Sequence, residues 1–126
     1  MEDKKITWAR MTVGQLLRQA DVELQRARDA TEVGNDGRAR TAARRAAGGA
    51  LTALKQRFPE RNYGDDVMRQ LRNLMDDVTV PLDVREAAER LQARITEQFT
   101  PAFSIDPVED AMTIVKYVNK CLGEHE

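Results

Sequence analysis

The stretch from Asp36 to Phe58 constrains the fold most, because it has helical length but few bulky side chains. It is rich in alanine, the best helix former, and Pro59 follows it as a stop signal. At about 100° per residue, its alanines gather on one face together with two leucines and a phenylalanine. This face is the expected intramolecular core: Ala39, Ala42, Ala43, Ala46, Ala47, Ala50, Leu51, Ala53, Leu54 and Phe58.

The opposite arc of the same helix carries small residues from which a water-facing helix gains nothing. Gly48 lies at the centre of this arc with Thr41 and Thr52, and Gly49 lies at its edge. Each glycine costs a helix about 1 kcal/mol relative to alanine, so we expect something to pack closely there. That neighbour is either a helix of a second subunit, as in a two-fold dimer, or an anionic ligand. The alternative is a solvated face that tolerates glycine. Thr41, Gly48, Gly49 and Thr52 are therefore the predicted interface residues.

Apolar periodicity and capping residues predict five helical segments and no strand. In the fourth segment, Asp83 and Glu86 form a capping-box pattern, and in the last, Asp106 precedes Pro107 at the first helical position. The short link around Gly34 implies that the first two helices are antiparallel. We expect an all-α fold, a four- to five-helix up-down bundle over residues 12–122, with an arm at 1–11 and a tail at 123–126.

Composition and charge limit the classes of protein that this chain can belong to. No apolar run approaches the roughly 20 residues needed to cross a bilayer, and "MEDKKITWAR" lacks the hydrophobic stretch of a signal peptide. The single cysteine, Cys121, fits a reducing compartment, so we expect a cytoplasmic location. Residues 1–61 carry 13 basic and 8 acidic residues, whereas residues 62–126 carry 7 and 13. This asymmetry indicates either a basic surface for an anionic partner or attraction between two halves of one bundle.

Groups that bind metals or transfer protons are sparse. The one histidine, His125, is next to the last residue, and the chain has no second histidine or cysteine to complete a zinc site. We therefore expect no metal and no cofactor. Arginine forks fit phosphate and carboxylate equally well, so the densest basic cluster either holds RNA or nucleotide phosphates or pairs with acidic residues across an interface. That cluster consists of Arg38, Arg40, Arg44 and Arg45, of which Arg44 and Arg45 are predicted phosphate ligands.

The order of segments is familiar as a whole. A first helix with "ADVELQRARDA" precedes "ARTAARRAAGGALTALKQRF", two shorter helices, the break "QFTPAFS" and a last helix "DPVEDAMTIVKYVNKCL". From about residue 12 to residue 122, this pattern resembles the HEPN family of small helical bundles from bacteria and archaea. The resemblance implies a homodimeric bundle of four to five helices. It also implies, as for many members, action beside a nucleotidyltransferase in a toxin–antitoxin-like pair.

Active HEPN proteins are metal-independent RNases in which four to six residues separate an arginine from a histidine. Arg94 matches that arginine and is a predicted phosphate ligand, but Phe99, Thr100 and Pro101 occupy the histidine positions. A Pro-x-Arg-Tyr pattern found in another branch is also absent, because Phe103 stands where its arginine would be. Arginine cannot shuttle protons at neutral pH. We therefore expect a non-catalytic, dimeric binding module, the alternative being a ribonuclease or an RNA- or nucleotide-binding subunit that uses its basic patch.

Overall fold

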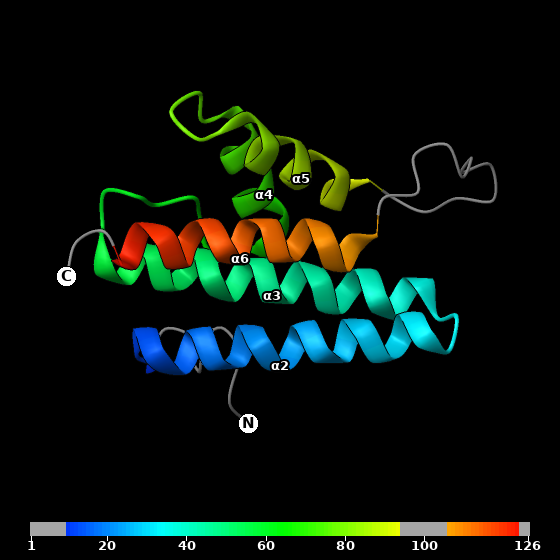
Figure 1. The fold of residues 1–126 in the computed structure, drawn as a ribbon. Coiled ribbons are helices and arrows are strands. Elements are labelled where there is room, and N and C mark those ends of the chain that lie inside the picture. Colours follow the sequence, from blue (N-terminus) through cyan, green and yellow to red (C-terminus); the bar gives the residue numbers. More distant parts are fainter. Residues whose placement is uncertain (1–9, 94–105, 124–126) are drawn as a thin grey trace.

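The computed structural model describes residues 10–93 and 106–123, and the helices in this part of the chain confirm the all-α prediction (Figure 1). The described residues form five helices and contain no strand. The helices are α2 (Val13–Glu32), α3 (Asp36–Arg57), α4 (Val67–Asp76), α5 (Leu82–Gln92) and α6 (Pro107–Gly123).

Helix α3 is the centre of the bundle. It packs against α2 on one side and α6 on the other, and the short pair α4–α5 lies on the side of the bundle away from α2 (Figure 1). Helices α2 and α3 are antiparallel, as the short link predicted, whereas α6 runs in the same direction as α3 (Figure 1). Because neighbours surround α3, 12 of its 22 residues are buried. Because the side chains of α3 are small, α2, α6 and the α4–α5 pair can all pack close to its axis.

Side chains cap three helix starts, of which the one at Asp106 was predicted from the sequence. The Thr12 hydroxyl accepts a hydrogen bond from the Gln15 amide, and the Gln15 side chain accepts one from the Thr12 amide, which completes a capping box. Asn35 caps α3 by accepting from the amide of Arg38. Asp106 accepts from the amide of Val108 at the start of α6. Local side-chain chemistry thus fixes the ends of the long helices.

The predicted start of the fourth helix was wrong. Helix α5 begins at Leu82 with Pro81 in the capping position, and no side chain caps it. The ring of Pro81 already holds a φ of −54°, and its carbonyl oxygen accepts from the amides of Val84 and Arg85. The helix therefore begins before Asp83, whose charge instead lies in the first turn and complements the helix dipole.

The core is aliphatic and lies where α3, α4, α5 and α6 converge. Its largest fully buried side chains come from five helices, and the methyl groups of the α3 alanines fill the space between them. Those large side chains are Leu16, Leu51, Leu54, Leu71, Leu74, Leu91, Ile114 and Val118. Within the described ranges, no helix combines the length and apolarity needed to cross a membrane.

Two side chains that flank the glycines of α3 bond to the chain's own short helices. Gly48 and Gly49 are buried. One turn after Gly48, the Thr52 hydroxyl accepts a hydrogen bond of 3.1 Å from Gln70 of α4. One turn before it, Arg44 bonds to the end of α5. The neighbours of Thr52 and Arg44 thus belong to the same chain, and the interface role of Gly48 and Gly49 stays a prediction.

Candidate functional site

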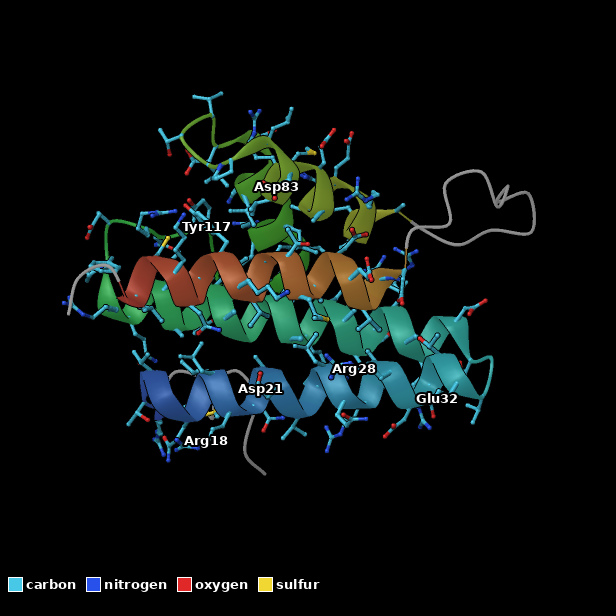
Figure 2. All side chains as sticks on the ribbon, viewed as in Figure 1. Arg18, Asp21, Arg28, Glu32, Asp83 and Tyr117 are labelled. Carbon is cyan, nitrogen blue, oxygen red and sulfur yellow. The ribbon has the colours of Figure 1, made fainter. Side chains whose placement is uncertain are left out.

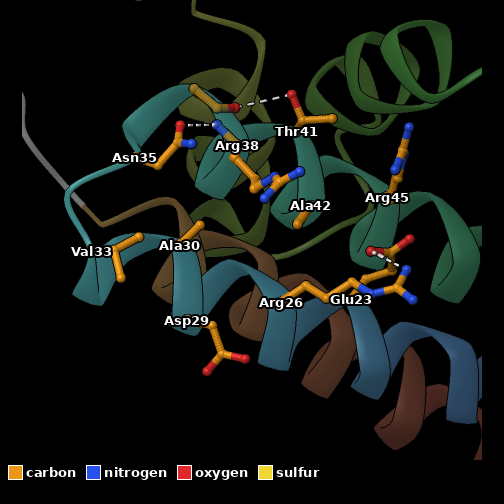
Figure 3. A pocket seen from close by; sticks show the side chains of 11 residues that line it. Glu23, Arg26, Asp29, Ala30, Val33, Asn35, Arg38, Thr41, Ala42 and Arg45 are labelled. Carbon is orange, nitrogen blue, oxygen red and sulfur yellow. Dashed lines mark hydrogen bonds and ion pairs between the residues drawn. The ribbon is translucent and has the colours of Figure 1, made fainter.

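A groove lies between the end of α2 and the beginning of α3 (Figure 3). Its volume is about 810 Å³. It exists because both helices present methyl groups there, Ala30 from α2 and Ala42 from α3, and these side chains leave space that larger residues would fill. The turn residues Val33 and Asn35 close one end of the groove. A groove of this size is within the range of small-molecule sites.

Three arginines surround this groove. Arg26 comes from α2, whereas Arg38 and Arg45 come from α3, two helical turns apart (Figure 3). All three are exposed, and the Arg26 side chain keeps 61% of its surface accessible. The groove also borders the N-terminus of α3, where Gly37 is one of the lining residues. Helix N-termini favour anions, so the arginines and the helix dipole act in the same direction.

Two carboxylates accompany the arginines. Asp29 is exposed and accepts a hydrogen bond of 3.0 Å from Gln25 on the outer face of α2. Glu23 is only 4% exposed, and its carboxylate is paired with the Arg26 guanidinium at 3.4 Å (Figure 3). The groove therefore combines a cationic rim with one buried carboxylate.

The basic cluster predicted from the sequence divides between two sides of α3. Arg38 and Arg45 line the groove. Arg44 donates from Nε to the carbonyl oxygen of Leu91 at 2.6 Å and from Nη2 to that of Ala93 at 2.9 Å. Arg40 donates from Nη1 to the carbonyl oxygen of Arg90 at 2.9 Å. Arg40 and Arg44 thus satisfy the last carbonyls of α5, and Arg44 has a structural task that the sequence did not indicate.

The other predicted site residues are dispersed. Thr41 is exposed, lines the groove and donates its hydroxyl to the carbonyl oxygen of Gly37. Thr52 is half-buried and lies further along α3, where its hydroxyl accepts a hydrogen bond from Gln70 of α4. Arg94 and His125 lie outside the described residues. The structure therefore places two of the predicted residues, Thr41 and Arg45, together at one site.

Sequence reasoning missed a polar network at the other end of the bundle. Arg61, in the segment after α3, donates to the hydroxyls of Tyr63 at 3.0 Å and Tyr117 at 2.6 Å, and Tyr63 donates to the carboxylate of Asp77. In Figure 2, Tyr117 lies on the side of α6 nearest this segment. The one signal available was the scarcity of tyrosine, since the chain has two and both are in this network.

The electrostatics of this network favour a fixed structural unit. Burial raises the pKa of Tyr63 to about 12, and the hydrogen bond to Asp77 adds to that effect. Burial opposes ionisation of Asp77, but hydrogen bonds from Thr79 and Tyr63 outweigh it and lower the pKa of that carboxyl. At neutral pH the tyrosine is therefore neutral and the aspartate is charged. This arrangement joins the segment after α3, the end of α4 and the end of α6.

The described part of the chain contains no cluster of metal-ligating side chains. Among residues 10–93 and 106–123, no group of three or more histidine, cysteine, aspartate or glutamate side chains is placed to hold an ion. Comparisons with known proteins add no assignment: no protein-family model, curated protein or solved structure matches this chain. The HEPN resemblance stays a prediction, and the groove is the feature from which a function is inferred.

Proposed function

We propose that this chain is a non-catalytic helical module that binds a phosphate-bearing ligand, a nucleotide or an RNA strand, in the groove between α2 and α3. The observation that carries the proposal is the convergence of Arg26, Arg38 and Arg45 around one hollow of about 810 Å³. Their guanidinium groups donate in the planar fork that phosphate oxygens accept. The adjoining N-terminus of α3 adds a favourable dipole.

The residues of this groove support binding rather than catalysis. Among its described lining residues, none is a histidine, cysteine or tyrosine. RNA cleavage through a 2′-hydroxyl needs a group that exchanges protons near neutral pH, and arginine stays protonated there. The sequence points the same way, because the histidine of the HEPN RNase pattern is replaced by Phe99, Thr100 or Pro101.

The homodimer and the nucleotidyltransferase partner implied by the HEPN resemblance belong to this proposal as its second part. One observation favours an association of this kind. Val78 and Leu82, at the turn between α4 and α5, are 78% and 64% exposed. Contiguous exposed apolar patches mark surfaces that protein partners cover, so this turn is where we expect a partner to dock. The solution mass, measured by light scattering, tests the dimer, because a mass of one chain at micromolar concentration contradicts it.

Equilibrium binding of ribonucleotides tests the phosphate-binding role. We expect the variant carrying Arg38→Ala and Arg45→Ala to bind a mononucleotide or a short RNA at least tenfold more weakly than the native chain. Arg18→Ala is the matched control, because Arg18 is exposed on α2 and points away from α3 (Figure 2). Native affinity is expected to fall steeply with added salt. Absence of binding, or equal loss in Arg18→Ala, would contradict the proposal.

A further inference from the structure

Glu23 is an unexpected residue at its position on α2. The residues of this helix that face α3 recur every three or four positions, and Glu23 is the one ionisable member among Leu16, Ala20, Leu24, Ala27 and Ala30. Charged side chains are rarely so buried unless a partner neutralises them. Glu23 is 4% exposed, and it is one of the residues that line the groove.

The partner that the chain provides for Glu23 is a weak one. Within the described residues, the bond to Arg26 at 3.4 Å is the one interaction of this carboxylate. Good charge-assisted N–H···O bonds measure about 2.7 to 2.9 Å. Arg26 lies three residues further along the same helix and keeps most of its side chain in water. The Glu23 carboxylate, which lines the groove, therefore retains capacity to accept hydrogen bonds from a bound molecule.

A carboxylate at this position is unfavourable for a ligand that consists of phosphate alone, because the two anions repel each other. A ligand that fits both features carries phosphate toward Arg38 and Arg45 and N–H donors toward Glu23. Among the four RNA bases, guanine is the one whose Watson–Crick edge presents two adjacent N–H donors, N1–H and the 2-amino group, which match two carboxylate oxygens. Adenine and cytosine present a donor beside an acceptor, and uracil presents one donor between two carbonyl groups.

We infer that the groove selects a guanosine 5′-phosphate unit, with Glu23 reading the base and the arginines of α3 binding the phosphate. This inference rests on the proposed function and names the ligand class for the same site. The unit is either a free nucleotide or a guanosine in an RNA strand. Both sources present the same base edge and the same phosphate to the groove.

The test compares four ligands on the native chain and on matched variants. The ligands are GMP, AMP and two RNA tetramers, one of adenosine and one with a single guanosine in place of an adenosine. We expect the native chain to prefer GMP over AMP at least tenfold, and Glu23→Gln to lose that preference through weaker binding of GMP, whereas its affinity for AMP does not fall. Asp21→Asn, which neutralises an exposed carboxylate of α2 that does not line the groove, is expected to keep the preference. If the tetramer with one guanosine binds more tightly than GMP, RNA is the source of the ligand. If that tetramer binds more weakly than GMP, the free nucleotide is the ligand.

Inosine 5′-phosphate makes the test independent of how well the variant folds, because it lacks the 2-amino group of guanine. We expect the native chain to bind it several-fold more weakly than GMP. Equal affinity for GMP, inosine 5′-phosphate and AMP on the native chain overturns the guanine inference but leaves phosphate binding intact. If the native chain binds no nucleotide and neither tetramer, the proposed function fails together with the inference.

Discussion

Arg44 and Arg45 are adjacent in the sequence but act on different sides of α3. Arg44 donates to the carbonyl oxygens of Leu91 and Ala93 at the end of α5, whereas Arg45 lines the groove beside α2. Successive residues of a helix point about 100° apart, so two neighbouring arginines reach different elements. One of them stabilises the fold, and the other belongs to the candidate binding site.

This division predicts opposite consequences for two equivalent substitutions. Arg44→Ala removes two charge-assisted hydrogen bonds to carbonyl oxygens at the end of α5, so we expect the free energy of unfolding to fall by about 2 kcal/mol. Arg45→Ala is expected to change it by less than about 0.5 kcal/mol, as is usual for exposed residues. Urea unfolding followed by circular dichroism measures both. Equal effects would mean that the two side chains do not divide in this way.

The fold was predictable where short-range chemistry decides it. Asp106 caps α6 as the sequence predicted, because an N-cap depends on a side chain and amides within three residues. The start of α5 was not predicted correctly, since Pro81 preorganises the backbone before the more obvious capping box at Asp83. The helical periodicity of α3 predicted its core face correctly, but it did not predict how many helices pack around α3.

The candidate site was less predictable, because it depends on which element covers each side of α3. The sequence indicated that Gly48 lies against something, but not that the neighbouring positions Thr52 and Arg44 bond to α4 and α5 of the same chain. It also grouped four arginines that the structure separates into two pairs. Glu23 carried no signal at all, since a glutamate in an amphipathic helix is ordinarily exposed, and its burial depends on how α2 packs on α3.

The ion pair between Arg90 of α5 and Asp110 of α6 predicts an asymmetric response to mutation. The two side chains meet at 2.9 Å, with the Asp110 side chain 3% exposed and the Arg90 side chain 35% exposed. Burial raises the pKa of Asp110 even though Arg90 bonds to it. Arg90→Ala leaves a buried carboxylate unpaired and should cost about 2 to 3 kcal/mol, whereas Asp110→Asn leaves an arginine that water can reach and should cost less. Chemical denaturation of both variants measures this difference.

The double variant Arg90→Ala with Asp110→Asn is the control for that prediction. It removes the buried charge together with its partner, so it should recover part of the stability that Arg90→Ala alone loses. A double variant less stable than Arg90→Ala would contradict the assignment of the cost to the unpaired carboxylate.

Tyr63 predicts a loss of stability in alkaline solution. Below pH 10 the phenol keeps its proton in the folded and unfolded states alike, but as the pH rises from about 10 to about 12, the unfolded tyrosine loses it while Tyr63 retains it. The folded state then binds more protons, so the free energy of unfolding falls over this interval.

Tyr63→Phe should be about 1 to 2 kcal/mol less stable at pH 7, because its hydrogen bonds with Arg61 and Asp77 are lost. It should also show a shallower alkaline fall. Urea midpoints at pH 8, 10 and 11 measure both effects, and parallel curves for the two proteins would rule out this role of the phenol.

Two glycines near the turn between α2 and α3 should respond to alanine in opposite directions. Gly34 has a φ of +77°, which costs an alanine about 1 to 2 kcal/mol, so Gly34→Ala should lower the melting temperature by several degrees. Gly37 lies in the first turn of α3, and an added Cβ meets no atom within 4 Å. Gly37→Ala should therefore raise the free energy of unfolding by about 0.5 to 1 kcal/mol through the lower entropy of the unfolded chain.

Gly34→Asn separates backbone strain from a general intolerance of side chains, because asparagine accepts the left-handed conformation more readily than alanine. If Gly34→Asn is as unstable as Gly34→Ala, the loss does not come from the backbone conformation at that turn.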